Sequence, residues 1–287
     1  MRFTKMQGLG NDYIYVNCLE ENVPDPVETA RKISDRHFGV GSDGLVLILP
    51  DEEADFRMRM FNSDGSESEM CGNAARCVGK YIHDRGLSDS EEIRLMTGAG
   101  IKTLRLTVRD GRTESVRVDM GEPILEAERI PTTLTGLKVI NTPVEVLGET
   151  YGATCVSMGN PHAVIFVRDA DHFDVHGVGP VIENYPLFPR KTNVEFVTVD
   201  DRENLRMRVW ERGAGETMAC GTGACATLVA TVLNGLCERK AILQLNGGPL
   251  TVEWDPKTNH VFQEGPAEFV FDGETEENFP PWDPALR

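Results

Sequence analysis

Two stretches, RMRMFNSDGSESEMCGN (57–73) and RMRVWERGAGETMACGT (206–222), repeat one pattern of residues at a constant offset. Both begin with Arg-Met-Arg, pass through a glycine-containing turn and end on a cysteine followed by glycine. The offset is 206 − 57 = 149, and the two cysteines, Cys71 and Cys220, give the same value, 220 − 71 = 149. The repetition predicts that the chain is a tandem of two related halves.

The repeat extends to the beginning of each half. GLGNDYIYV around Asn11 aligns with SMGNPHAVIFV around Asn160, and 160 − 11 is again 149. We therefore expect a first half over residues 1–121 and a second over 131–273, joined by a polar, proline-containing segment. The last strand of the second half is a candidate for packing on the first half, and residues 274–287 are expected to form a peripheral tail.

The periodicity of the sequence predicts an α+β fold. Segments rich in strand-forming residues favour half-buried strands at YIYVNC (13–18), LVLIL (45–49), IKTLRLTV (101–108) and TESVRVDM (113–120). An Asp-Gly pair in RDGR (109–112) predicts a hairpin turn. Helical signals closed by a C-terminal glycine cover residues 25–39, 73–86 and 223–235.

The composition limits the class of partner. The chain has 29 basic and 46 acidic residues, and its formal net charge of −17 would repel nucleic-acid phosphates and anionic membrane surfaces. The N-terminal MRFTKMQGLGNDY lacks the apolar region of a secretion signal, and no run approaches the ~18 apolar residues of a membrane span. We expect a cytoplasmic protein whose seven cysteines are reduced thiols.

Each of the two repeated cysteines is expected at a helix N-terminus. Unsatisfied backbone N–H groups and the positive end of the helix dipole favour anions there, which lowers a thiol pKa and holds a substrate carboxylate. Halves related by a pseudo-twofold axis would bring the two thiols to face each other across a cleft. One thiolate would then remove the α-proton of an amino acid, and the opposite thiol would return a proton with inversion. No pyridoxal-binding lysine motif is apparent, so we expect no cofactor.

The other cysteines are expected to pack in the interior. Cys77 and Cys225 lie six and five positions beyond the repeated cysteines, on other faces of the helices, so neither can share a metal with its neighbour. Burial is the usual role of a free cysteine, and we extend it to Cys18, Cys155 and Cys237.

Two further patterns carry no site. GVGSDG (39–44) matches G-x-G-x-x-G, but it follows a predicted helix and leads into a strand, the reverse of the dinucleotide fingerprint. The six histidines show no metal-ligand spacing, so we expect no metal.

The two halves differ at Glu211 and Arg212, which stand where the first half has Asn62 and Ser63. A duplicated site that exchanges an amide for a charged pair indicates a polar, asymmetric ligand. Both residues are therefore candidate ligand contacts, and His162 is a further candidate near them.

The sequence resembles the diaminopimelate epimerases, cofactor-independent enzymes that interconvert LL- and meso-diaminopimelate on the route to lysine and peptidoglycan. The resemblance rests on GLGNDY, FNSDGSESEMCGNAARC, GNPHAV, TNVEF and ERGAGETMACGTGACA, in this order and up to about residue 273. It implies two pseudo-symmetric halves, each a β-barrel-like sheet around a central helix, with the active site in the cleft between them. It also implies a small-molecule amino acid substrate and, in many members, a homodimer.

The resemblance also implies a role for each matched residue. Cys71 and Cys220 would be the two acid/base thiols. Backbone and side-chain donors to the reacting α-carboxylate would come from Gly72, Asn73, Gly221 and Thr222. Glu211 would bind the reacting ammonium, Arg212 the distal carboxylate, and His162 would border the reacting centre. The distal amino acid centre would be held by Asn11, Asn62, Asn160 and Asn193.

Two positions depart from the family pattern. Ala74 replaces a usual glycine, which a first-turn position with negative φ tolerates, and Gly44 stands where some members carry a substrate-binding glutamine.

Two alternatives stay open. A two-thiol racemase of another amino acid, such as histidine, would use the same chemistry, although Arg212 and the four asparagines favour a substrate with a distal amino acid group. A redox-sensing or metal-binding thiol protein would be expected to show metal-ligand spacing or a C-x-x-C motif, and the sequence has neither.

Overall fold

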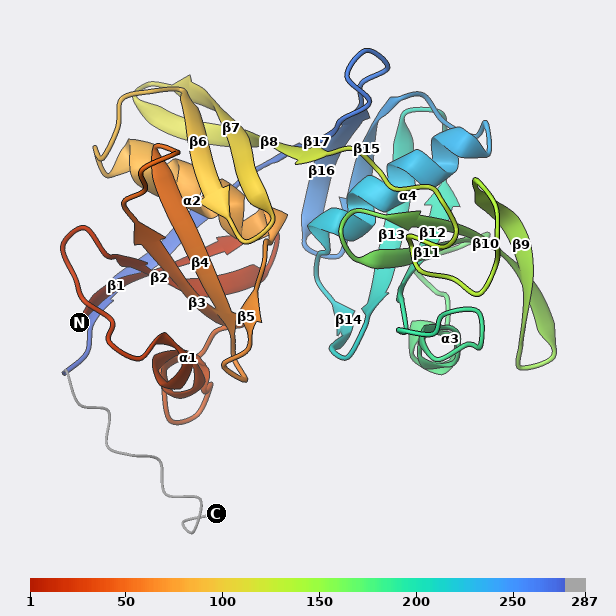
Figure 1. Cartoon of the computed structure of the whole chain (residues 1–287), viewed down its shortest axis with the longest axis horizontal. Helices are drawn as coiled ribbons and strands as arrows, with labels where there is room; N and C mark the ends of the chain where they lie inside the picture. The colour runs from red at the N-terminus through yellow and green to blue at the C-terminus, as the bar shows by residue number, and fades with distance from the viewer. Residues whose placement is uncertain (277–287) are drawn as a thin grey trace, which may run out of the picture. The chain divides into compact units, whose positions relative to one another are not determined.

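The computed structural model describes residues 1–276, so residues 277–287 of the expected tail lie outside the described part. The chain forms two compact units, one built from Met1–Val116 with the segment from Pro266 onward, the other from Arg117–Gly265 (Figure 1). No helix among the described residues is long and apolar enough to cross a membrane.

The first unit surrounds one buried helix with strands. Its helices are α1 (Pro26–Ser34) and α2 (Gly72–Asp84). Its strands are β1 (Arg2–Gly8), β2 (Asn11–Asn17), β3 (Gly44–Leu49), β4 (Phe56–Asn62), β5 (Glu67–Ser68), β6 (Glu92–Thr97), β7 (Gly100–Arg109), the first part of β8 (Arg112–Gly121), and β18 (Glu268–Glu274). Every residue of α2 from Gly72 to Ile82 is buried. Strand β18, from the end of the described chain, pairs with β1 in this unit.

The second unit is built in the same way. Its helices are α3 (Val175–Glu183) and α4 (Gly221–Leu233). Its strands are β9 (Val139–Val146), β10 (Glu149–Ser157), β11 (Pro161–Phe166), β12 (Asn193–Val199), β13 (Asn204–Glu211), β14 (Gly215–Thr217), β15 (Lys240–Leu245), β16 (Gly248–Trp254) and β17 (Val261–Gly265). Helix α4 contacts β10, β11, β12, β13, β15, β16 and β17, so strands enclose it on most sides.

The two units repeat each other element by element. Helix α2 begins at Gly72 and α4 at Gly221, and 221 − 72 = 149; α1 and α3 give 175 − 26 = 149. The parallel pair β2–β3 sets Tyr13 opposite Gly44, and the pair β11–β12 sets His162 opposite Asn193 at the same offset. The predicted α+β fold of two related halves is confirmed.

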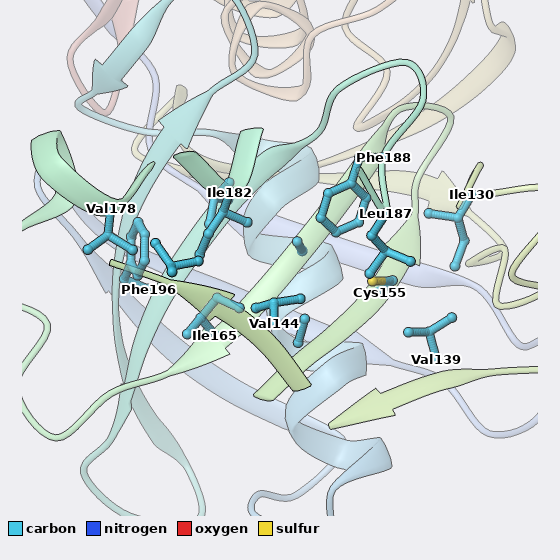
Figure 2. Packing of buried hydrophobic residues seen from close by; sticks show 14 of the residues in the cluster. Ile130, Val139, Val144, Cys155, Ile165, Val178, Ile182, Leu187, Phe188 and Phe196 are labelled. Carbon is cyan, nitrogen blue, oxygen red and sulfur yellow. The ribbon is translucent and has the colours of Figure 1, made fainter. Parts of the chain in front are cut away.

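Apolar side chains from strands, helix α3 and connecting segments form one hydrophobic core cluster of the second unit (Figure 2). Val178 and Ile182 reach this core from α3, and Phe196 joins it from β12. Cys155 is buried in the same cluster, as expected. Helix α3 has no strong sequence signal because it contains two glycines and Pro180, yet Asp174 caps it by accepting from the N–H of Gly177 at 2.9 Å.

Most local expectations are confirmed, but one helix is shorter than expected, and β2 and β3 are buried along most of their length rather than half-buried. Asp110 and Gly111 have φ of 51° and 73°, which is the geometry of a tight hairpin turn. Helix α1 ends at Ser34 rather than at residue 39, because Asp35 leaves the helical region at ψ 123°. Its carboxylate then accepts from the N–H of His37 at 2.8 Å, which fixes a turn in place of another helical turn.

The remaining cysteines lie in the interior, with one exception. Cys77 and Cys225 are fully buried, and Cys237 is buried as well. Cys18 is only partly buried, where it packs on the edge of the core of the first unit. The expectation of a buried position is therefore wrong for Cys18, which follows the end of β2 in a turn.

Candidate active site

Each repeated cysteine is the N-cap residue of the buried helix of its unit. Cys71 has φ −136° and ψ 123°, and Cys220 has φ −120° and ψ 109°, both extended. The first helical hydrogen bonds run from Ala75 N to Cys71 O and from Ala224 N to Cys220 O, each 2.9 Å long. The N–H groups that precede these bonds lie outside the helical ladder, beside the thiols, where they favour an anion.

Helix positions next to the thiols hold the predicted carboxylate-binding residues. These residues are Gly72 and Asn73 at the start of α2 and Gly221 and Thr222 at the start of α4. The structure therefore brings each of them within the first helical turn after its cysteine.

The other predicted residues lie at strand ends. Asn11 and Gly44 open β2 and β3, and Asn62 closes β4. The second unit repeats the arrangement with Asn160 just before β11, Asn193 at the start of β12 and Glu211 at the end of β13. Because β2–β3 and β11–β12 are parallel, the openings of the paired strands lie at one edge of each sheet.

In the first unit, Asn11 connects the thiol to a carboxylate. Cys71 Sγ lies 3.4 Å and Asn73 Nδ2 3.5 Å from Asn11 Oδ1. A hydrogen bond of 2.7 Å from Asn11 Nδ2 to Asp43 Oδ2 fixes the orientation of the Asn11 amide, so that its oxygen faces the thiol. Asp43 was not among the predicted site residues, although it stands directly before the strand that supplies Gly44.

Gly44 has no room for a side chain. A Cβ at this position would lie 2.0 Å from the backbone oxygen of Phe61 and 2.7 Å from a ring carbon of Tyr13. The backbone of β4 cannot give way without breaking the ladder that pairs Gly44 with Asn62. The structure therefore offers no place for the glutamine that some family members carry here.

Arg76 is a second residue that the sequence analysis missed. Its side chain is fully buried, its Nη2 donates to Asn73 Oδ1 at 2.9 Å, and its Nε donates to Pro266 O at 3.1 Å. A cation on the buried face of a helix is the signal that could have revealed it. Arg76 fixes the orientation of the Asn73 amide.

In the second unit, a hydrogen-bonded chain begins at the thiol. Cys220 is 6% exposed, and its Sγ lies 3.5 Å from Thr222 Oγ1. Asn160 Nδ2 donates to Thr222 Oγ1 at 3.2 Å, and Asn160 Oδ1 lies 3.0 Å from His162 Nε2. The structure thus groups His162 with the predicted site residues of this unit.

The chain ends on Glu195, which the sequence analysis also missed. Glu195 Oε1 lies 2.7 Å from His162 Nδ1, and both side chains are fully buried. Among the described residues, no hydrogen-bond partner is found for the other carboxylate oxygen, Oε2. A glutamate inside the apolar strand sequence NVEFVTV, where the first half has Val46, was the available signal.

Glu211 places a second carboxylate beside Cys220. Thr217 Oγ1 donates to Glu211 Oε1 at 2.5 Å, while burial raises the pKa of the Glu211 carboxyl. Burial raises the pKa of the Cys220 thiol well above its usual value, and the charges of Glu211 and Glu195 raise it further, so the expectation of a lowered thiol pKa is wrong for Cys220 in the absence of substrate. Hydrogen bonds from the Thr222 side chain and the Gly223 backbone act in the opposite direction.

Arg212 is held by its backbone and leaves its side chain exposed. Its N–H donates to Asn193 Oδ1 at 2.8 Å, and Asn193 Nδ2 donates to Pro161 O at 3.0 Å. Arg212 Nη1 donates to Arg190 O at 3.2 Å. In the first unit, Asn62 Nδ2 donates to Ser66 Oγ at 3.0 Å, across the turn that follows β4.

Comparison with proteins of known structure shows the fold. A phenazine biosynthesis protein of the PhzF family from Bacillus anthracis matches with a TM-score of 0.71 and 17% identity, covering 96% of this chain and 99% of that chain. A hydroxyproline epimerase from Agrobacterium vitis matches with a TM-score of 0.68 and 15% identity, covering 98% and 92%. At these identities the likeness concerns the fold alone.

Sequence comparison identifies the family. The sequence model described as Diaminopimelate epimerase matches residues 3–126 and 154–270. A diaminopimelate epimerase from Acetivibrio thermocellus is 62% identical over 278 residues, covering 97% of this chain and 99% of that protein. One from Methanococcus maripaludis is 55% identical over 274 residues, covering 96% and 99%. Matches of this extent, over both half-sites, show that the chain belongs to the diaminopimelate epimerase family.

Proposed function

We propose that the protein epimerises LL-diaminopimelate to meso-diaminopimelate, with Cys71 and Cys220 as the two acid/base groups and without a cofactor. The observation that carries the proposal is the repeated N-cap thiol, one in each unit, in a chain 62% identical to a protein named diaminopimelate epimerase. In this reaction one sulfur takes the α-proton and the other sulfur delivers a proton to the opposite face of the same carbon.

The helix N-termini supply the electrostatics that this chemistry requires. Removing an α-proton leaves negative charge that spreads onto the α-carboxylate. First-turn N–H groups of α2 and α4 are oriented before the substrate arrives, so they stabilise that charge without reorganisation. In our proposal Gly72, Asn73, Gly221 and Thr222 carry these donors.

Glu211 adapts the second half-site to an α-ammonium group. Its negative charge contributes to the raised pKa of Cys220. A substrate ammonium beside Glu211 would offset that charge and so lower the pKa of Cys220 toward a value useful for catalysis. Substrate binding and activation of the thiol are coupled in this way.

The substrate's distal amino acid group accounts for the remaining polar residues. Arg212 is exposed and presents a guanidinium that fits a carboxylate, and the amides assigned to the distal centre are Asn11, Asn62, Asn160 and Asn193. Histidine lacks a distal carboxylate, so Arg212 favours diaminopimelate over the alternative of a histidine racemase. The names of the matched relatives agree with this choice.

Incubation with LL-diaminopimelate, followed by chiral chromatography, tests the proposal. We expect the meso isomer to accumulate without added cofactor. In D₂O, deuterium should appear early at the α-carbon of the product and be nearly absent from recovered substrate, since each thiol serves one face. Failure to form the meso isomer, with inversion of histidine instead, would establish the rival substrate.

We extend the proposal to the assembly and location of the enzyme. The resemblance favours a homodimer, which light scattering of the purified protein tests directly. Because the proposed reaction belongs to amino acid biosynthesis, we place it in the cytoplasm, and cell fractionation tests that location.

A further inference from the structure

The two units differ at a buried strand position near the catalytic thiol. Glu195 in β12 corresponds to Val46 in β3, since 195 − 46 = 149, and both side chains are fully buried. Gly223 in α4 corresponds to Ala74 in α2, since 223 − 74 = 149. A Cβ at Gly223 would lie 2.7 Å from Glu195 Oε1. The second unit therefore has a buried carboxylate at Glu195. It also has glycine at position 223, where a side chain would occupy the space that this carboxylate fills.

The Glu195 carboxylate determines which atoms of the neighbouring side chains donate hydrogen bonds and which accept them. An ionised carboxylate only accepts hydrogen bonds, so the 2.7 Å contact requires that His162 Nδ1 carries a proton. Across the ring, His162 Nε2 faces the oxygen of Asn160 at 3.0 Å, so it donates as well. An acceptor oxygen therefore faces each ring nitrogen of His162, and a buried carboxylate is tolerated where such a hydrogen-bonded partner lies beside it.

The direction of these bonds continues to the sulfur. Asn160 uses its oxygen for His162 and its Nδ2 for Thr222 Oγ1 at 3.2 Å. The Thr222 hydroxyl accepts that bond, and its own proton is then available to Cys220 Sγ at 3.5 Å. From His162 onward each member donates toward the sulfur, and these bonds favour the thiolate, in opposition to the direct effect of the Glu195 charge, which raises the pKa of Cys220.

We propose that Glu195 is a positioning residue that, through His162, Asn160 and Thr222, orients a hydrogen-bond donor onto the thiolate of Cys220. The inference deepens the proposed function and rests on it. The ionisable groups that face this chain are Glu211 from the end of β13 and Cys155 from β10, and both interact electrostatically with Glu195.

The first unit lacks this arrangement. Cys71 Sγ faces the oxygen of Asn11, because the Asn11 Nδ2 donates to Asp43. An amide oxygen can only accept, so this contact favours the protonated thiol. The residue that replaces the imidazole is Tyr13, which lies opposite Gly44 in the equivalent register. The two thiols are thus set in chemically different environments by buried or partly buried carboxylates.

The first test replaces Glu195→Gln, which keeps the size of the side chain and removes its charge. We expect kcat with diaminopimelate to fall by about tenfold or more, part of the ~10²–10⁴-fold that a well-placed acid/base group contributes, while KM stays within about twofold. In protein labelled with ¹⁵N-histidine, both ring N–H signals of His162 should be present in the wild type and at least one should be lost in the variant. Asp84→Asn, which removes the charge of a partly buried carboxylate that pairs with Lys80 in the first unit, should change neither readout.

A second variant separates packing from polarity. Glu195→Val combined with Gly223→Ala copies the buried pair of the first unit, so it should fold, yet it should lose as much kcat as Glu195→Gln. If Glu195→Gln does not fold, the kcat of this double variant tests the proposal by itself. Wild-type kcat in either variant, or unchanged His162 signals in Glu195→Gln, would overturn the proposal. If wild-type protein does not epimerise diaminopimelate, the proposed function fails, while the His162 signals still test the link to Glu195.

Discussion

Thr217 should set the lower pH limit of activity, because its hydroxyl donates a hydrogen bond to the Glu211 carboxylate. Its hydroxyl donates to Glu211 Oε1 at 2.5 Å and opposes the effect of burial, which raises the pKa of Glu211. Thr217→Val removes this donor with little change in volume. A hydrogen bond to a charged group is worth about 1.5–3 kcal/mol, and one pKa unit corresponds to about 1.4 kcal/mol. The pKa of Glu211 should therefore rise further when this hydrogen bond is lost.

The sign of the effect follows from the proposed role of Glu211. The carboxylate must be ionised to bind an ammonium, so a higher pKa moves the acidic limb of kcat/KM to higher pH by about 1–2 units. Above the new limb, kcat/KM should return to the wild-type value. The assay is kcat/KM for LL-diaminopimelate between about pH 5 and 9, the range that brackets such a limb.

A matched control comes from the other half of the chain. Ser68 is the equivalent of Thr217, since 217 − 68 = 149, and the strand before it ends in Asn62 instead of a carboxylate. Ser68→Ala should leave the acidic limb of kcat/KM at its wild-type pH. Thr217→Ser keeps a hydroxyl donor, so its acidic limb should also lie at the wild-type pH. An unshifted limb in Thr217→Val, or an equal loss at every pH, would refute the reasoning, because the latter would indicate disturbed packing.

Three further expectations concern the thiols, the closed glycine position and the distal site. Cys71→Ser or Cys220→Ser should each lower kcat by about 10²-fold or more, since a hydroxyl is a poor base near neutral pH, while Cys18→Ser stays near wild type; equal activity in all three variants would contradict the assignment. Gly44→Ala forces a Cβ to 2.0 Å from a backbone oxygen and should cost about 1–3 kcal/mol, seen as a lower Tm; an unchanged Tm would show that the strand yields. Arg212→Lys should raise KM by about tenfold or more because an ammonium cannot make the planar two-point contact, and a wild-type KM would place Arg212 outside the site.

Local patterns in the sequence determined the elements and their repetition. Alternating residues located β7 and β8, a continuous apolar run located β3, the Asp-Gly pair located the hairpin turn, and glycines with φ of +72° follow α2 and α4 at Gly86 and Gly235. The constant offset placed both thiols at equivalent helix N-termini. These features depend on backbone preferences and on the period of buried positions, both of which are visible within a few residues.

In helix α3, tertiary packing overrides the local preference of the sequence. Its glycines and proline are poor helix formers, so no periodic signal marked it. The structure forms it nonetheless, because Val178 and Ile182 bury their side chains in the core of the second unit. The offset of 149 from α1 and the N-cap residue Asp174 are the features of the sequence that point to it.

Only the tertiary structure decided which polar groups meet around each thiol. Glu195 and His162 are 33 residues apart, Asn160 and Thr222 are 62 apart, and Asn11 and Asp43 are 32 apart. Parallel pairing between β11 and β12, and the return of the chain through α4, bring these groups together. A single sequence does not reveal such pairs, because the cost of burying a charge depends on the partner that the fold places beside it, not on its neighbours along the chain.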